Sequence, residues 1–302
     1  MELIKLFGGL IGDESRLLER ESMKKHTTFH IGGEAELFIK ALSAAEIVGV
    51  LKLCQSEGIE RLVLGAGSNI LVGDGGIDGV VLKVSESTVN VNGDVITAGA
   101  GAPLSAIAQK AFEAGLSGLE FAYGIPGALG GALFMNAGAY DGEIKDVVAS
   151  VTVVRADDNF SIDIIGNEDM KFGYRTSAAQ TERLTILAAE LRLREGNKKD
   201  IGDKMARLNA LRKQKQPLDL PSAGSAFKRP EGFFAGKLIA DAGLAGFSVG
   251  GARVSEKHCG FVVNYDKASA RDVRELMDRV KEIVFNKFGV ELRPEIRFVG
   301  NF

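Results

Sequence analysis

The sequence contains few cysteines and histidines, the residues that most often build disulfide frameworks and metal sites. Cys54 and Cys259 are the only cysteines, so no disulfide framework is expected. His26, His30 and His258 do not stand at metal-ligand spacing with cysteines or carboxylates. We therefore expect no metal in this protein.

Long apolar runs and an excess of basic charge are also missing. No apolar run approaches the roughly 20 residues of a membrane span. Charged residues interrupt the start of the chain, so the apolar core of a signal peptide is lacking as well. The formal net charge is -3 and both signs of charge are spread along the chain, which argues against a nucleic-acid surface. We expect a cytoplasmic protein that binds neither membranes nor nucleic acid.

Glycine, by contrast, is abundant. The chain has 38 glycines among 302 residues, about one in eight against a usual ~7%. They cluster at 65–79, 115–142 and 243–260, which indicates backbone close to ligands rather than disorder. The length favours two or three substructures, and a hydrophobic content of 45% is enough for substantial cores.

The stretch 63–76 is the most informative of these clusters. An apolar run, 61–64, indicates a buried strand, and a glycine-rich loop follows it. Gly65 and Gly67 allow positive φ and expose successive backbone N–H groups, while Ser68 and Asn69 add side-chain donors. Such a turn forms a concavity that attracts phosphate oxygens.

Two familiar phosphate-binding motifs do not match this loop. A Rossmann fingerprint needs a third glycine that opens a helix, but Ile70 stands there and 70–72 indicates another strand. A Walker loop needs a terminal Gly-Lys-Ser/Thr, which is absent. Taken alone, the loop could equally be an ordinary glycine-rich hairpin.

The remaining pattern predicts an α/β protein. Residues 1–25 indicate a charged amphipathic helix, and small residues around 127–132 suit a short helix packed close to backbone or to a flat ligand. Strands are expected at 35–39, 80–84, 89–91, 95–98, 147–155, 184–193 and 260–264, and helices at 44–56, 103–114, 198–213 and 269–289. The last helix starts with a capping box, Ser269 and Asp272, and stops at Gly289.

Six segments together resemble the UDP-N-acetylenolpyruvoylglucosamine reductases (UDP-N-acetylmuramate dehydrogenases). They are Thr-Thr-Phe-His-Ile-Gly-Gly (27–33), Leu-Gly-Ala-Gly-Ser-Asn-Ile-Leu (64–71), Gly-Ile-Pro-Gly-Ala-Leu-Gly-Gly (124–131), Phe-Gly-Tyr-Arg-Thr-Ser (172–177), Ala-Gly-Ser-Ala-Phe-Lys (223–228) and Arg-Pro-Glu-Ile-Arg-Phe-Val-Gly (293–300). Each is weak alone, but their order and spacing across roughly residues 25–300 match the family. The short segment after Arg175 resembles the type II form.

The resemblance implies an FAD-binding module of the vanillyl-alcohol oxidase type in two subdomains, followed by a C-terminal α+β substrate domain. We place these parts at 1–84, 85–200 and 201–302. The family reaction is a ping-pong reduction in peptidoglycan precursor synthesis. NADPH reduces FAD, and the hydride then passes to the enolpyruvyl CH2 of a UDP-sugar that uses the same site. A monomer is expected.

The same resemblance assigns residues to cofactor and catalysis. The FAD pyrophosphate would be held by Gly65, Ala66, Gly67, Ser68, Asn69, Ile70 and Leu71, and the flavin would lie against Gly124, Ile125, Pro126, Gly127 and Gly130. Arg175 matches the family's catalytic arginine, Ser225 its proton donor and Glu295 its second active-site acid. A guanidinium can match a carboxylate with two donors as negative charge develops. A positioned hydroxyl can protonate a carbanion-like carbon.

Other interpretations stay open at this point. Without the resemblance, Arg175 would be a surface or ion-pair arginine, Ser225 a turn residue and Glu295 a surface acid. His30 and Arg229 depart from the residues usual in the family at their positions. The competing functions are a flavin oxidoreductase that oxidises a hydroxy acid or alcohol, and a flavin-free protein that only binds nucleotide-sugars.

Overall fold

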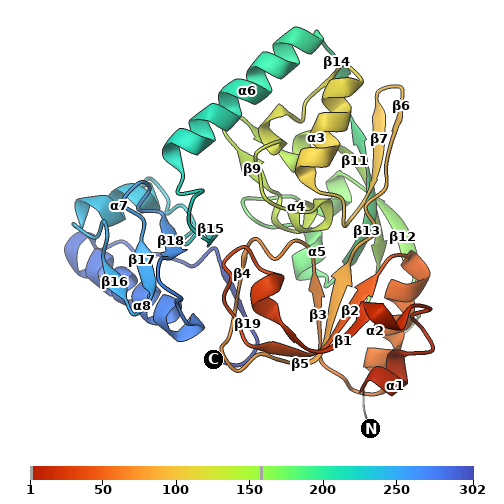
Figure 1. Ribbon diagram of the computed structural model, residues 1–302. Coiled ribbons are helices and arrows are strands. Elements are labelled where there is room, and N and C mark those ends of the chain that lie inside the picture. Colours follow the sequence, from red (N-terminus) through yellow and green to blue (C-terminus); the bar gives the residue numbers. More distant parts are fainter. Residues whose placement is uncertain (1–2, 157–158) are drawn as a thin grey trace. The chain divides into compact units, whose positions relative to one another are not determined.

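The computed structural model describes residues 3–156 and 159–302 (Figure 1). The chain divides into two compact units. The first unit comprises the described residues of Met1–Leu18, Leu37–Ala66 and Gly79–Arg212, and the second comprises Glu19–Glu36, Gly67–Asp78 and Lys213–Phe302. The three-part division expected from the sequence stays a prediction.

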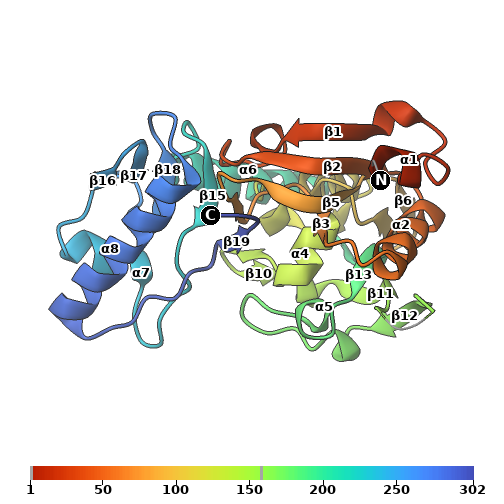
Figure 2. The same cartoon turned by 90° about the horizontal axis from the view of Figure 1, so that it is seen from below.

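A four-stranded sheet has the order β1-β2-β5-β3. Its strands are β1 (Leu17–Ser22), β2 (Glu34–Ala41), β3 (Arg61–Leu64) and β5 (Ile77–Val84), and Figure 2 shows β1, β2 and β5 side by side. Helix α2 (Ala44–Ser56) connects β2 to β3, with the predicted bounds. The hydroxyl of Ser43 caps this helix by accepting a hydrogen bond from the Glu46 N–H at 3.2 Å. Strand β3 therefore ends, parallel to β5, at the glycine-rich loop.

A five-stranded antiparallel sheet has the order β12-β11-β13-β7-β6. Its strands are β6 (Val89–Asn92), β7 (Val95–Gly99), β11 (Val148–Val154), β12 (Ile162–Gly166) and β13 (Thr185–Arg192). The associated helices are α3 (Leu104–Glu113), α4 (Leu129–Met135), α5 (Ala178–Thr181) and α6 (Lys198–Lys215). Helix α4 packs against β13, and α5 lies beside α4 (Figures 1 and 2).

Short elements complete the first unit. They are α1 (Leu3–Phe7), η1 (Glu14–Arg16), β8 (Leu116–Ser117), η3 (Glu120–Ala122), β9 (Gly138–Ala139), β10 (Gly142–Glu143), η4 (Ile144–Asp146), η5 (Glu168–Met170) and β14 (Arg194–Glu195). One cluster of buried apolar side chains includes residues of both sheets and of α1, β8, η3, η4 and η5. Helix α4, which follows the glycine-rich segment, packs into this cluster through Leu129, Ala132 and Leu133.

The second unit contains a sheet of order β15-β18-β17-β16. The elements are η2 (Met23–Lys25), β4 (Ile70–Val72), β15 (Ser222–Ser225), α7 (Ala235–Asp241), β16 (Ser248–Val249), β17 (Ala252–Val254), β18 (Phe261–Asn264), α8 (Ala270–Phe288) and β19 (Arg297–Val299). Helix α8 packs on β16 and β17. Its predicted capping box and its stop at Gly289 are confirmed.

The predicted helix over 1–25 is wrong over most of its length; residues 1 and 2 lie outside the described residues. Only Leu3–Phe7 is helical, and Leu17–Ser22 forms β1 at the edge of the first sheet. Gly8 and Gly9 follow directly after α1 and disfavour its continuation. The pairing of β1 in the sheet is a long-range contact that local periodicity does not report.

None of the helices in 3–156 and 159–302 combines the length and the apolar character needed to cross a membrane.

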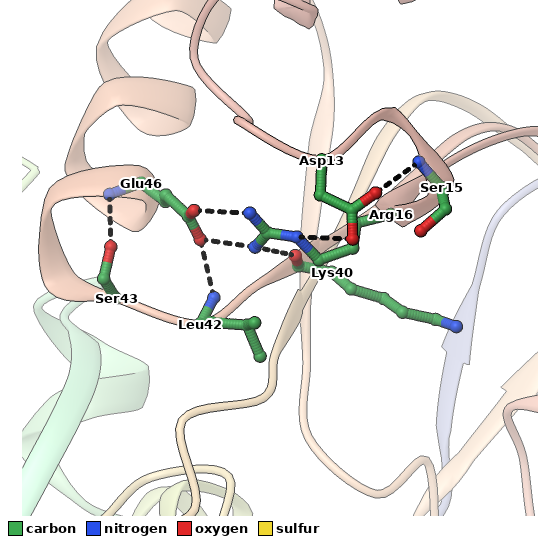
Figure 3. Close-up of polar contacts among 7 residues, drawn as sticks. All are labelled: Asp13, Ser15, Arg16, Lys40, Leu42, Ser43 and Glu46. Carbon is green, nitrogen blue, oxygen red and sulfur yellow. Dashed lines mark hydrogen bonds and ion pairs between the residues drawn. The ribbon is translucent and has the colours of Figure 1, made fainter.

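An ion pair joins η1 to the start of α2 (Figure 3). Both guanidinium Nη atoms of Arg16 donate to the Glu46 carboxylate at 2.8 Å, and Nη1 also donates to the Lys40 carbonyl at 3.1 Å. The Leu42 N–H donates to the same carboxylate at 2.7 Å. The two charged side chains are only 14% and 17% exposed. The pair therefore fixes the N-terminal segment on the helix with little competition from water.

We expect Glu46→Gln to lower the free energy of unfolding by about 1.5–3 kcal/mol, because a charge-assisted, two-point contact is lost. The hydrogen bond from Arg16 holds the pKa of Glu46 below its usual value. The stabilisation is therefore present above the ordinary carboxyl range and is lost as the pH falls through the lowered pKa. Chemical denaturation at pH 7 and near pH 3 measures both effects.

Glu34→Gln is the matched control, because its partner Arg20 lies in an exposed pair, with side chains 82% and 51% accessible. An equal loss of stability in both variants would contradict the importance of the Arg16–Glu46 contact.

Candidate functional site

Two of the glycine-rich segments meet in the first unit. A Cβ atom placed on Gly65, just after β3, would lie 3.7 Å from the backbone N of Gly131 in α4. Backbone hydrogen bonds fix the second segment, because Gly130 N–H donates to Ala100 O at 2.8 Å and Leu104 N–H donates to Gly127 O at 3.0 Å. Within 3–156 and 159–302, no atom beyond the helix's own backbone and the adjoining residues lies within 4 Å of a Cβ placed on Gly131. The end of β3 and the start of α4 thus lie together, with open space where a side chain at Gly131 would stand.

A half-buried lysine lies directly beside this junction. The Lys83 ammonium, on β5, donates to the carbonyl oxygen of Gly65. Among the described residues it has no carboxylate partner, and burial lowers the pKa of Lys83. A cation that is kept out of water without a counter-charge is costly, and an anionic ligand would offset that cost.

A second half-buried cation lies beside the other glycine-rich segment. The Cδ atom of Arg212, in α6, would be 3.1 Å from a Cβ placed on Gly124. The Nε atom of Arg212 is buried and has no hydrogen-bond partner in the described parts of the chain, and burial lowers the pKa of Arg212. The neighbouring Tyr140 hydroxyl donates to the Leu208 carbonyl of the same helix at 3.1 Å. The segment from Gly124 thus lies beside a guanidinium whose Nε atom has no hydrogen-bond partner among the described residues.

Arg175 occupies the corner of a tight turn in the first unit. Gly173 and Thr176 exchange backbone hydrogen bonds at 3.1 and 3.4 Å, and Arg175 has a φ of +54°. Its guanidinium Nη2 donates to the Gly138 carbonyl at 3.3 Å. Burial would raise the pKa of Glu143, but hydrogen bonds from Lys145 and Asn136, with the charges of Lys145 and Arg175, lower it. Arg175 therefore lies in the field of an ionised carboxylate.

Ser225 and Glu295 are brought together in the second unit. The segment after Ser225 pairs with the segment before β19, through a bridge between Phe227 and Pro294. Glu295 N–H donates to Ala226 O at 2.9 Å, next to Ser225. Two residues that are 70 positions apart in the sequence (225 and 295) are therefore neighbours in the fold.

The later part of the predicted pyrophosphate loop belongs to this second unit. The Asn69 side chain donates to the Glu295 carbonyl at 3.2 Å, and Asn69 O accepts from Arg297 N–H at 3.1 Å. Ser68, Ile70 and Leu71 are in the same unit, whereas Gly65 and Ala66 are in the first. The loop thus contacts the backbone of Glu295 through Asn69.

Gly67 has the positive φ that the sequence suggested, at +65°, whereas Gly65 does not adopt one. A Cβ at this position would lie 2.0 Å from the carbonyl oxygen of His26, and Thr28 N–H donates to Gly67 O at 3.2 Å. The crowding therefore comes from the protein's own backbone in segment 27–33. A substitution at Gly67 would report on folding, and it would not separate that effect from ligand binding.

Sequence reasoning missed Lys83 and Arg212. Lys83 interrupts the apolar run 80–84, and a single lysine in a buried strand was a usable signal. Arg212 stands in a strongly polar helix and had no such signal. Arg175 lies in the first unit, with Ser225 and Glu295 in the second, so the joint action of all three stays a prediction.

Comparison with known families decides what kind of protein this is. Residues 216–299 match the C-terminal domain of UDP-N-acetylenolpyruvoylglucosamine reductase. Residues 35–160 match an FAD binding domain.

Relatives extend the match over nearly the whole chain. The UDP-N-acetylenolpyruvoylglucosamine reductase of Caldanaerobacter subterraneus subsp. tengcongensis is 50% identical over 288 residues, 95% of each chain. That of Lachnoclostridium phytofermentans is 48% identical over 291 residues, 94% of this chain and 93% of the relative. The crystal structure of the Thermus caldophilus reductase superposes with a TM-score of 0.79 at 35% identity, covering 93% of this chain and 97% of that chain.

The chain belongs to the UDP-N-acetylenolpyruvoylglucosamine reductase family. It is an FAD-dependent oxidoreductase, and the predicted fold of an FAD-binding module followed by a C-terminal domain is confirmed. The two competing functions, a hydroxy-acid or alcohol oxidase and a flavin-free nucleotide-sugar binder, are wrong.

The residues of the first unit fit the cofactor of this reductase family. FAD combines an anionic pyrophosphate with a flat ring system. The described residues offer two half-buried cations without carboxylate partners, each beside one of the glycine-rich segments. They also offer an open position beside Gly131, because any residue other than glycine would place its side chain there. Both features match what such a ligand requires.

Two substitutions at Gly131 test the stability of the apoprotein and the binding of FAD separately. Because its Cβ position is open and lies within a helix, Gly131→Ala should stabilise the apoprotein by up to about 1 kcal/mol. Gly131→Leu should remain folded but bind FAD at least about tenfold more weakly, since the side chain fills the position assigned to the flavin. Denaturant unfolding of the apoprotein and titration by flavin fluorescence measure the two quantities.

Ser105→Leu, at an exposed site on α3, controls for the added apolar surface. Unchanged FAD affinity in Gly131→Leu would show that the flavin lies elsewhere.

Proposed function

We propose that this enzyme uses NADPH to reduce UDP-N-acetylglucosamine enolpyruvate to UDP-N-acetylmuramate, a step of peptidoglycan precursor synthesis in the cytoplasm. NADPH and the UDP-sugar react in turn at one site, in a ping-pong sequence, on a monomer. The support is the match of both family domains and of relatives that span about 95% of the chain. A division into 1–84, 85–200 and 201–302 is part of the same proposal.

The single observation that carries the chemistry is the pairing of the Ser225 and Glu295 segments in the second unit. FAD, when bound, would supply the hydride chemistry that links NADPH to the vinyl CH2 of the substrate. The adjacent carbon then carries the electron pair of the former double bond. A proton must reach that carbon to complete the lactyl product, and Ser225 is the residue assigned to deliver it.

Arg175 and Glu295 are assigned complementary roles. Negative charge that spreads onto the substrate carboxylate calls for a planar two-donor cation, which Arg175 provides. An ionised Glu295 would oppose that charge, so Glu295 acts either in its protonated form or as a partner that orients Arg175.

The cofactor assignment combines predicted and newly found residues. Gly65 to Leu71 hold the pyrophosphate, and 124–127 with Gly130 lie against the flavin. Lys83 and Arg212 supply the positive charge beside these two segments, supported by their partial burial and by the absence of a carboxylate partner among the described residues. This charge complements an anionic cofactor.

Ser225→Ala separates the two half-reactions. A hydroxyl that only donates a proton to substrate carbon is not needed when NADPH reduces the flavin. We expect near-normal bleaching of the flavin band by NADPH in anaerobic stopped flow. Recovery of the band on adding the enolpyruvyl sugar should slow by at least about a hundredfold.

Ser222→Ala is the matched control, because Ser222 lies on the same strand and the contact from Thr28 uses only its carbonyl oxygen. Equal slowing of both phases in Ser225→Ala would assign Ser225 a structural role. A normal second phase would mean that the proton comes from another group.

A further inference from the structure

The C-terminal end of α4 carries a fully buried amide. Asn136 is 0% exposed and has a φ of +44°, a left-handed conformation that asparagine tolerates better than most residues. Its Nδ2 donates to the Glu143 carboxylate at 3.1 Å and to the Gly173 carbonyl at 2.9 Å. Its Oδ1 accepts from Lys145 N–H at 3.2 Å. Both amide hydrogens and the amide oxygen are therefore engaged.

A second amide contacts the same turn from its other side. Gln180, in α5, donates to the Arg175 carbonyl at 3.2 Å and to the Phe134 carbonyl at 2.6 Å. The Ser177 hydroxyl donates to the same Phe134 carbonyl at 2.9 Å. Phe134 is in the last turn of α4, where carbonyls lack partners within the helix. Turn 173–176 is thus attached to the end of α4 by side chains on both of its flanks.

Arg175 needs such support. A left-handed φ costs an arginine about 1 kcal/mol or more, so the turn keeps this conformation only when its surroundings impose it. The turn tip is open, since Tyr174 is 49% exposed. The opposite end of α4 carries Gly130 and Gly131, beside Gly65. One short helix therefore connects the junction assigned to the flavin with the turn that carries Arg175.

We propose that Asn136 and Gln180 are positioning residues that hold Arg175 at a set distance from the cofactor segment through α4. The inference rests on the proposed function, in which Arg175 acts on the substrate carboxylate. Neither amide is assigned a contact with substrate. They act by fixing the backbone of the turn at Gly173 and Arg175.

Replacing each amide by the acid of the same shape isolates this role. In Asn136→Asp, an oxygen replaces the donor that faces the Glu143 carboxylate and the Gly173 carbonyl, so two attractions become repulsions. Gln180→Glu does the same toward the Phe134 and Arg175 carbonyls. Asn136→Gly keeps the left-handed backbone and removes the amide without adding charge. This variant replaces Asn136→Asp in the experiment if Asn136→Asp does not fold.

The experiment is a double-mutant cycle on the FAD-loaded enzyme. Each amide variant should slow reoxidation of the reduced enzyme by the enolpyruvyl sugar by about ten- to a hundredfold. FAD content should stay near that of the parent, whereas the melting temperature falls because the new repulsions are buried. In an Arg175→Lys background the same substitutions should add less than about twofold, because a displaced turn no longer matters once the two-donor fork is gone.

Asn167→Asp is the matched control. Asn167 also donates from one amide nitrogen to two backbone carbonyls of the first unit, those of Lys145 and Val148, but it does not contact the turn. Slowing of the same size in the Arg175→Lys background would overturn the positioning role and leave the role of Arg175 intact. A normal rate in Arg175→Lys alone would overturn the proposed function of Arg175, and this inference with it.

Discussion

The hydrogen bonds at the two ends of α4 are the interactions on which the candidate site of the first unit depends. At its start, Leu129 N–H and Gly130 N–H donate to Ala102 O and Ala100 O at 2.9 and 2.8 Å. At its end, side chains of Asn136, Ser177 and Gln180 join the helix to the Arg175 turn. A helix of seven residues is marginal by itself, so its place is set by these bonds and by packing on β13.

Uncompensated charge is the second physical feature of this unit. Lys83 and Arg212 are partly withdrawn from water without a carboxylate partner among the described residues. Withdrawing such groups from water lowers the stability of the apoprotein. An anionic cofactor that binds only the folded state raises that stability again by mass action. Cofactor binding and folding are therefore expected to be linked in this enzyme.

The second unit reaches its arrangement by backbone pairing. The bridge between Phe227 and Pro294, with the bond from Glu295 N–H to Ala226 O, places Ser225 and Glu295 on adjacent segments. Asn69 adds a contact from the glycine-rich loop to the Glu295 carbonyl. These contacts are made by backbone atoms, so they fix the spacing of the two segments whatever the side chains are.

The sequence by itself determined the elements whose signals are local. The bounds of α2, the capping box and stop of α8, and the positive φ at Gly67 follow from side chains within a few residues of each position. The order of six short motifs pointed to Arg175, Ser225 and Glu295 and to the cofactor loops. Only the tertiary structure decided that 17–22 is a strand, that 19–36 and 67–78 belong with 213–302, and that Lys83, Asn136 and Arg212 lie at the candidate site. These features depend on pairing and burial between distant residues, and the periodicity and capping chemistry of a single segment carry no record of such partners.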